Sequence, residues 1–362
     1  MILHKIHLSN FRNYFDREFS FSDQLTIIIG PNTTGKTTIL EAIMLLSTGS
    51  SFRAEREQEM IQTGQEVARV KVLVETGLRP VSTDSINVIL TPGVVQGKKA
   101  PYKKFALNKI DKRKSDIIGN LPSVLFWPED LYLIIGSPSG RRRYLDTVLS
   151  QADRLYYRSL TLYEKALRVR NKLLSLIKEH VSIKQDELSF WEKQLIDNGA
   201  VIHDTRASYI SSLNSFVLQE KRDIQFNVSY DHSVVSQERF DTYYDAERGA
   251  GMTLVGPHRD DFIVYKGDAP DEAQHLKKFG SRGEQRMGVL WLKLAELSYL
   301  EHALDIKPLL LLDDILSELD TNHKKLVLKS IYNQQTILTT ADPAAIPESI
   351  MKRAKIIRLT SD

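Results

Sequence analysis

The segment from Gly30 to Thr38 contains the residue types that bind the phosphates of a nucleotide. Its sequence, Gly-Pro-Asn-Thr-Thr-Gly-Lys-Thr-Thr, fits the pattern G-x-x-x-x-G-K-[ST]. The backbone N–H groups of such a loop and the start of the following helix bind phosphate, Lys36 would reach the β- and γ-phosphates, and Thr37 would ligate Mg²⁺. We therefore expect this chain to bind ATP and Mg²⁺ through Gly30, Pro31, Asn32, Thr33, Thr34, Gly35, Lys36, Thr37 and Thr38.

The residues on either side of this loop predict the elements that such a loop requires. The apolar run from Leu25 to Ile29 predicts a buried strand before the loop. The spacing of Ile39, Leu40, Ile43 and Met44 predicts a helix after it. A chance match in a glycine-containing turn would lack this strand–loop–helix context.

Two carboxylates, Asp313 and Asp314, follow a second apolar run, from Pro308 to Leu312, which predicts a buried parallel strand. A strand that is buried on both faces ends at the cleft of a parallel sheet. There, Asp313 could hold Mg²⁺ through its water shell, and Asp314 could orient or deprotonate an attacking water. The alternative is that this pair of aspartates only caps the next turn.

Two further motifs resemble those of ABC-type ATPases. The stretch from Phe279 to Arg286 resembles their signature motif, and its Ser281 and Glu284 also form an S-x-x-E capping box that would begin an amphipathic helix. The two interpretations are compatible, because a capped helix start binds anions. The sequence Ser-Glu-Leu-Asp ending at Asp320 resembles the D-loop. We expect Ser281, Gly283, Gln285 and Asp320 to bind nucleotide.

The order of these motifs resembles that of SMC and Rad50 type ATPases, in which a helical insertion separates the two halves of one head. The insertion here is too short for an SMC rod, and the whole chain resembles the RecF family. The resemblance rests on Asn10–Tyr14, Leu40–Ile43, Ser51–Arg53, Leu121–Phe126, Pro128–Leu131, Arg142–Asp146, Tyr163, Arg170–Leu174, Gly256–Asp261, Pro308–Asp314 and Leu316–Asp320. Two residues depart from the family pattern: Thr33 replaces a glycine and Glu284 replaces a glutamine.

The resemblance implies an α/β fold, a P-loop ABC-type ATPase head with a second, mainly helical lobe. Lobe I would comprise residues 1–122 and 286–362, and lobe II residues 123–285, with an antiparallel helical arm at about 150–218. It also implies an ATP-dependent homodimer in which two protomers sandwich ATP between the P-loop of one and the signature motif of the other. Glu129 would take the place of the Q-loop glutamine as a catalytic residue with Lys36 and Asp314. Arg12 could reach a phosphate, or it could pair with Asp16 at the surface.

The function that the resemblance implies is binding of double-stranded, single-stranded or gapped DNA in recombinational repair and in the repair of replication gaps. Such a protein assists RecA loading with RecO and RecR during the SOS response, and its ATPase is weak, slow and stimulated by DNA. The alternative is the ATPase head of another SMC-like DNA-processing protein. A P-loop kinase and a scaffold with an inactive ATPase are more distant alternatives.

The candidate DNA surface is a lysine-rich hairpin between Gly97 and Lys114, interleaved with Tyr102 and Phe105. Positive side chains bind backbone phosphates with little further requirement. The alternative is a strand edge that lysines protect from aggregation. The expected DNA-binding residues are Lys98, Lys99, Lys103, Lys104, Lys109, Lys112, Arg113 and Lys114. A second basic cluster, Arg141–Arg143, could bind DNA or pack at the start of a helix.

Composition narrows the possibilities further. The 362 residues include no cysteine, which excludes disulfides, thiolate zinc sites and cysteine nucleophiles. The formal net charge of +3 is too small to indicate nucleic-acid binding by itself. The start of the chain carries polar residues in place of a signal-peptide core, and the sequence contains no apolar stretch of membrane-spanning length, so we expect a cytoplasmic protein with no membrane partner.

Overall fold

The computed structural model describes residues 1–75, 83–218, 225–267, 270–318 and 321–360. The chain divides into two compact units: Met1–Asp130 with Glu296–Asp362, and Leu131–Ala295. We call these unit 1 and unit 2 and describe each by itself. Within the described residues, no helix is long and apolar enough to cross a bilayer.

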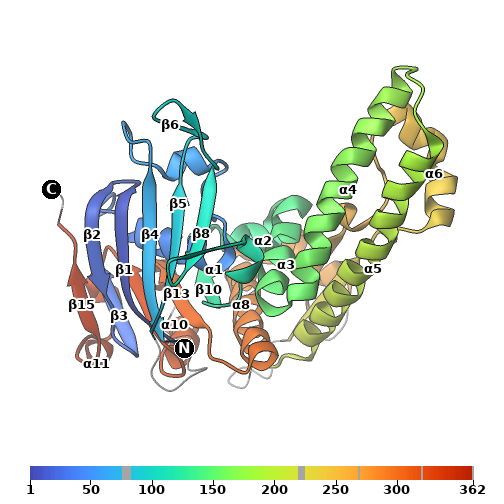
Figure 1. Ribbon diagram of the computed structural model, residues 1–362. Coiled ribbons are helices and arrows are strands. Elements are labelled where there is room, and N and C mark those ends of the chain that lie inside the picture. Colours follow the sequence, from blue (N-terminus) through green and yellow to red (C-terminus); the bar gives the residue numbers. More distant parts are fainter. Residues whose placement is uncertain (76–82, 219–224, 268–269, 319–320, 361–362) are drawn as a thin grey trace. The chain divides into compact units, whose positions relative to one another are not determined.

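Unit 1 contains a six-stranded antiparallel sheet with the order β2-β1-β4-β5-β8-β9 (Figure 1). Residues alternate along β4 between buried and more exposed positions, as expected for a sheet with one face on the core. The strands are β1 (Ile2–Phe11), β2 (Tyr14–Ser20), β4 (Ala68–Glu75), β5 (Thr83–Leu90), β8 (Lys103–Leu107) and β9 (Ile110–Lys112).

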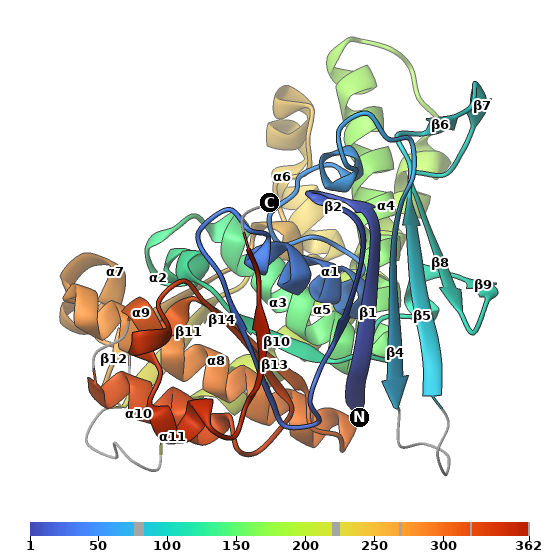
Figure 2. The same ribbon diagram turned by 90° about the vertical axis from the view of Figure 1, so that its left-hand side faces the viewer.

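The second sheet of unit 1 is parallel throughout and has the order β10-β13-β14-β3-β15 (Figure 2). Its three central strands are completely buried, which explains why their sequences are continuous apolar or threonine-rich runs. The edge strand β15 was not predicted, since its sequence Lys-Ile-Ile-Arg is short and flanked by charges. The strands are β3 (Leu25–Ile29), β10 (Ser123–Phe126), β13 (Leu309–Asp313), β14 (Thr336–Thr340) and β15 (Lys355–Arg358).

Helix α1 (Lys36–Thr48) packs against strands of both sheets and is the centre of the unit 1 core. Ile39, Leu40 and Ile43 are fully buried, as their spacing predicted. The smaller elements of unit 1 are η1 (Glu57–Met60), β6 (Val94–Val95), β7 (Lys98–Lys99), η2 (Lys114–Asp116), η3 (Pro128–Leu131), α9 (Ile315–Glu318), α10 (Thr321–Ser330), η6 (Pro343–Ala345) and α11 (Glu348–Met351).

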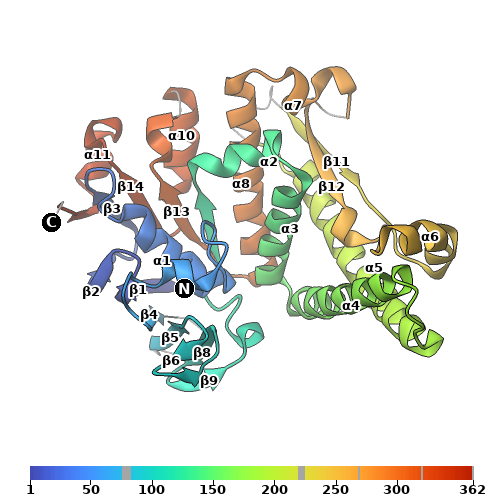
Figure 3. The same cartoon turned by 90° about the horizontal axis from the view of Figure 1, so that it is seen from above.

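Unit 2 is mainly helical, and its longest helices, α4 (Arg154–Lys178) and α5 (Gln185–Ser215), lie side by side (Figure 3). They correspond to the predicted helical pair. Helix α6 was not predicted, and it packs against α4. The other elements are α2 (Tyr132–Ile135), α3 (Pro138–Ala152), β11 (Phe226–Asp231), α6 (Gln237–Ala250), η4 (Pro257–Arg259), β12 (Asp261–Lys266), η5 (Glu272–Gln274) and α7 (Leu276–Phe279).

The unit boundaries fall later than the expected lobe boundaries at 122/123 and 285/286. Strand β10, expected in lobe II, pairs with β13 in the parallel sheet and so lies in unit 1. Helix α8 (Arg282–Leu304), expected almost wholly in lobe I, contributes the larger part of its length, as far as Ala295, to unit 2. Sequence periodicity could not place these boundaries, because neither strand pairing nor the division of one long helix is visible in the pattern.

Candidate nucleotide-binding site

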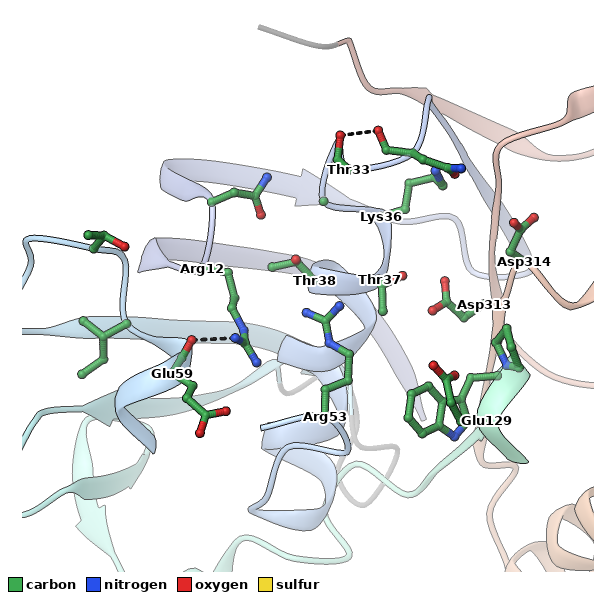
Figure 4. A pocket seen from close by; sticks show the side chains of 17 residues that line it. Arg12, Thr33, Lys36, Thr37, Thr38, Arg53, Glu59, Glu129, Asp313 and Asp314 are labelled. Carbon is green, nitrogen blue, oxygen red and sulfur yellow. Dashed lines mark hydrogen bonds between the residues drawn. The ribbon is translucent and has the colours of Figure 1, made fainter. Parts of the chain in front are cut away.

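A cavity of about 680 Å³ in unit 1 brings together residues that are far apart in the sequence. Figure 4 shows Lys36 and Thr37 beside Asp313 and Asp314, with Arg12 and Arg53 on the other side of the start of α1. The lining residues are Arg12, Asn13, Asn32, Thr33, Gly35, Lys36, Thr37, Thr38, Arg53, Glu59, Ile61, Thr63, Trp127, Pro128, Glu129, Asp313 and Asp314.

The loop that leads into α1 has the backbone of a phosphate-binding loop. Gly35 has φ 93°, and a Cβ atom there would lie 2.6 Å from Asn13 Nδ2, so only glycine fits. Lys36 follows as the first residue of α1, and its Nζ donates hydrogen bonds to the carbonyl oxygens of Gly30 (2.7 Å) and Pro31 (2.8 Å). The lysine is thus held inside the curl of the loop.

Two opposing influences act on the pKa of the Lys36 ammonium group. Burial lowers the pKa of its ammonium, whereas the carboxylates of Asp314 and Asp313 raise it, and the net result is a lowered pKa. A buried cation next to two carboxylates is a site at which further negative charge stabilises the ammonium form. A triphosphate would supply that charge.

The two aspartates stand at the end of β13, as predicted. Thr339 Oγ1 on the neighbouring strand donates to Asp313 Oδ1 over 2.6 Å and orients this carboxylate. Asp314 has φ 51°, and the N–H of Ser317 bonds to its main-chain oxygen over 3.3 Å. The main chain therefore closes this turn, which leaves the Asp314 carboxylate on the cavity wall and counts against the capping alternative.

The oxygen ligands in the cavity fit a magnesium ion. Thr37 and Asp313 both line it and offer a hydroxyl and a carboxylate, which are hard oxygen donors. The described residues contain no group of three or more His, Cys, Asp or Glu side chains that could hold a metal by themselves. This pattern is typical of Mg²⁺ held by one or two protein oxygens together with substrate phosphates.

A fully buried carboxylate, Glu41 on α1, fixes two arginines on the cavity wall. Arg12 binds it through Nε (3.0 Å) and Nη2 (2.7 Å), and Arg53 through Nη2 (2.7 Å). Burial raises the pKa of Glu41, but hydrogen bonds from Arg12 and Ser51 and the charge of Arg53 outweigh this effect, so the pKa is lowered. The alternative that Arg12 pairs with Asp16 is wrong, because the Arg12 guanidinium binds Glu41 and donates to the main-chain oxygen of Glu59 over 2.6 Å.

Arg53 and Glu41 were missed as site residues in the sequence. Both lie in segments that carry the family resemblance, and this was the only signal that could have identified them. Glu129 lies in η3 and lines the cavity beside Trp127 and Pro128. It is therefore in the cavity where the resemblance placed a catalytic residue, and its role stays a prediction.

Thr33, one of the two departures from the family pattern, has φ 72°. This left-handed conformation is strained for a residue with a branched Cβ. The Thr33 hydroxyl donates to the carbonyl oxygen of Asn32 over 2.5 Å. The glycine that the family carries at this position would adopt the same backbone without strain.

The candidate signature residues lie in unit 2, where the predicted capping box is formed. Ser281 Oγ accepts from the N–H of Glu284 (3.3 Å), and Glu284 Oε2 accepts from the N–H of Ser281 (2.9 Å). Lys266 also holds Glu284, over 2.7 Å. Gly283 lies in the first turn of α8, and Gln285 donates to the Leu276 carbonyl over 3.0 Å. Asp320 lies outside the described residues.

The sequence of this chain matches a family model described as "RecF/RecN/SMC N terminal domain" over residues 2–358. It is 35% identical to the DNA replication and repair protein RecF of Agathobacter rectalis, over 94% of this chain and 92% of that protein. It is 34% identical to the RecF of Ligilactobacillus salivarius, over 99% and 96%. The chain belongs to the RecF family.

Solved structures agree with the RecF assignment. A structure described as "recombination mediator protein RecF-ATP in RecFOR pathway" matches with a TM-score of 0.85 at 31% identity, covering 96% of this chain and 93% of that one. The corresponding RecF-ATPrS structure matches with a TM-score of 0.84, also at 31% identity, covering 95% and 94%. An Smc head from Pyrococcus furiosus matches with a TM-score of 0.53 at 18% identity, covering 99% and 93%, and supports the fold alone.

In this RecF-family chain the lysine-rich hairpin is two short strand pairs, β6–β7 and β8–β9. Lys103 is largely enclosed and binds Glu57 (2.9 Å) and the Gly49 carbonyl (2.8 Å). Lys104 pairs with Asp111 over 2.8 Å, and Lys114 donates to Ser50 Oγ over 3.0 Å. Phe105 is buried in the core, so it does not interleave the basic surface. The predicted residues that remain exposed without a recorded ion pair among the described residues are Lys98, Lys99, Lys109, Lys112 and Arg113.

Two arginines of the Arg141–Arg143 cluster bind the segment Gly256–Asp261. Arg141 binds Asp261 through Nε (2.6 Å) and Nη2 (2.8 Å). Arg142 donates to the main-chain oxygen of Asp260 over 2.8 Å, and Arg206 of α5 binds the Asp260 carboxylate over 2.8 Å. These contacts fasten α3 and α5 to the segment, which favours the packing interpretation for Arg141 and Arg142.

Proposed function

We propose that this chain is an ATP-dependent DNA-binding protein of recombinational repair and replication-gap repair in the cytoplasm. It would assist RecA loading with RecO and RecR and take part in the SOS response. The observation that carries the proposal is the cavity in which Lys36, Thr37, Asp313 and Asp314 converge. The names of its relatives, DNA replication and repair proteins, supply the biological context.

The cavity supports a division of roles among its residues. Backbone N–H groups from Gly30 to Thr38 would hold the phosphates, and Lys36 would neutralise the terminal ones. Thr37 and Asp313 would hold Mg²⁺, which would reduce charge repulsion between phosphate oxygens. Asp314 and Glu129 would orient or deprotonate the attacking water.

ATP would act as a dimerisation switch rather than as a source of rapid turnover. The capping box leaves Ser281 and Gly283 at an exposed helix start, where backbone N–H groups favour an anion. We propose that this site, with Gln285 and Asp320, contacts the ATP held by the P-loop of a second copy. Hydrolysis of the γ-phosphate would remove the shared contact and open the dimer.

The exposed cations Lys98, Lys99, Lys109, Lys112 and Arg113 are the DNA contacts that we propose in unit 1. Lys103 and Lys114 already bind neighbouring groups in unit 1, so we expect them to support the hairpin rather than to contact DNA. Their own substitution would change the local structure together with DNA binding.

The test compares the wild-type chain with Lys36→Ala. We expect the wild type to bind ATP with Mg²⁺ and to bind DNA more tightly when ATP is present. Lys36→Ala should lose ATP binding by about 100-fold or more, since a charge-assisted contact to phosphate is lost, and its DNA binding should not respond to ATP. Equilibrium binding of labelled ATP and of labelled DNA measures both effects.

Two results would contradict the proposal. Wild-type protein that binds neither ATP nor DNA would exclude it, and DNA cleavage dependent on ATP would favour the alternative of another SMC-like DNA-processing enzyme. Lys98→Glu with Lys99→Glu measures the share of the hairpin in DNA binding, and ATP binding should not change in that variant.

A further inference from the structure

Helix α4 carries a single row of exposed cations along its outer face. Arg154, Arg158, Lys165, Arg168 and Lys172 follow one another at spacings of four, seven, three and four residues, and all are exposed. Residues at such spacings share one face of a helix. The row runs from Arg154 to Lys172, a rise of about 27 Å at 1.5 Å per residue. We call these five residues the α4 basic row.

The α4 basic row lies opposite the packed side of the helix. Tyr156, Tyr163 and Arg170 mark the buried side, and α4 packs against α3, α5 and α6. The views in Figures 1 and 3 show α5 alongside α4 over most of its length. The fold of unit 2 therefore uses the other sides of α4 and leaves this row uncovered within the unit.

The five cations of the row outnumber the exposed carboxylate of α4 beside them, Glu164. Among the described residues, no ion pair is recorded for any of the five side chains. Lys165 lies over the ring of Trp191, 5.8 Å from its centroid, and this contact leaves its charge in place. Like charges three or four residues apart each destabilise a helix by about 0.2–0.5 kcal/mol, so the row does not serve the stability of α4.

Helix α5 shows that the row is not a general property of the arm surface. The corresponding exposed face of α5 carries Asp186, Asp197 and Asp204, with Lys193 as its one cation. A surface that serves solubility alone would mix both signs on each helix. Here the exposed charges of α4 are mainly positive, with Glu164 as an exception, and those of α5 are mainly negative.

We propose that the α4 basic row is a DNA-contact surface in unit 2 that binds the phosphate backbone of duplex DNA without reading its sequence. A duplex carries one negative charge per about 1.7 Å, so about 16 phosphates lie beside a row of this length. Single-stranded DNA is bound chiefly by aromatic stacking. The exposed α4 residues that flank the row are Leu155, Thr161, Leu162 and Glu164, and none of them is aromatic. The ring of Trp191 on α5 lies under Lys165.

This inference rests on the proposed function, since it adds a second contact surface to a DNA-binding protein. The test variant is Arg158→Glu with Arg168→Glu. The matched control is Lys193→Glu with Arg248→Glu, which makes the same change in net charge at exposed positions of α5 and α6 in the same unit. Thermal unfolding followed by circular dichroism shows whether both variants keep the fold.

Binding to a labelled duplex longer than the row is measured at several salt concentrations, with ATP and Mg²⁺ present. We expect the α4 variant to weaken binding by about ten-fold or more and to reduce the slope of log affinity against log salt by about two, because each phosphate contact contributes about 0.9. The control variant should keep the wild-type slope, and both should bind ATP normally.

Equal affinity and slope in the α4 variant and the control would overturn the inference while leaving the proposed function intact. A wild-type chain without DNA binding would overturn both. A changed oligomeric state of the α4 variant with unchanged DNA binding would assign the row to a protein partner and would also overturn the inference. A greater loss for single-stranded than for duplex DNA would contradict the choice of duplex.

Discussion

At the scale of single residues, Thr33 places backbone strain in the candidate phosphate-binding loop. Its φ of 72° belongs to the left-handed region, which costs a residue with a Cβ about 1–2 kcal/mol. Thr33 is exposed in the loop and lines the cavity, so tight packing does not hold it there. The closing of the loop around Gly35 and Lys36 imposes this backbone on Thr33.

We expect Thr33→Gly to raise the free energy of unfolding of unit 1 by about 1 kcal/mol, since the strain removed exceeds the extra freedom of the unfolded chain. Urea-induced unfolding measures the change. Thr33→Ala keeps the Cβ and the strain, and Thr63→Gly changes a cavity residue that has no positive φ. A gain in Thr33→Ala equal to that in Thr33→Gly would show that the hydroxyl, not the backbone, is responsible.

At the scale of elements, hydrogen bonds to the Glu284 carboxylate stabilise the start of α8. Glu284 accepts from Lys266 and from both the N–H and the hydroxyl of Ser281. The hydrogen bond from Lys266 is the largest influence, and together these contacts lower the pKa of Glu284 from 4.5 to about 2. These contacts hold the Glu284 carboxylate against the helix start and Lys266. Glu284 stands where the family pattern has a neutral glutamine.

The lowered pKa predicts how this cap depends on pH. The unfolded chain binds a proton at Glu284 more readily than the folded one, so the contribution is complete above about pH 4.5 and is lost as the pH falls through about 2. Glu284→Gln should therefore lower the unfolding temperature of unit 2 near pH 7 and have less effect toward pH 2. Thermal unfolding across this range tests it, with Glu238→Gln at the exposed start of α6 as control. A difference that does not vary with pH would contradict the prediction.

Helix α1 carries both Lys36 and Glu41, the carboxylate that holds Arg12 and Arg53. One helix thus fixes three cations around the same cavity. Removing a partner from a buried ion pair leaves an uncompensated charge. The position of both arginines therefore depends on a residue that faces away from solvent.

At the scale of the whole molecule, the two halves of the proposed ATP site would belong to different copies of the chain. We expect ATP with Mg²⁺ to shift the chain from monomer to dimer, and DNA to strengthen the shift. Ser281→Arg should still bind ATP, since the cavity of unit 1 is unchanged, but should block dimerisation because a bulky cation occupies the helix start. Light scattering coupled to size-exclusion chromatography measures the mass, and loss of ATP binding by Ser281→Arg would contradict the shared site.

The sequence by itself determined the local chemistry of this protein. The glycines at 30 and 35, Lys36 and the apolar strands before the loop and before Asp313 have a spacing that few structures other than a P-loop site satisfy. The capping box at Ser281 was equally readable, because its two partners are three residues apart. Local steric and hydrogen-bonding rules suffice for such features, since all the participating atoms lie close together in the chain.

Only the tertiary structure decided which distant residues meet and which charges remain free. Arg12 in the turn after β1 and Arg53 in the loop after α1 converge on Glu41 of α1. Lys103 binds Glu57, and β10 joins the parallel sheet of unit 1. The row on α4 emerges only when packing shows which side of that helix is covered. These outcomes depend on burial and strand order, which arise from the packing of the whole chain and not from the spacing of residues along it.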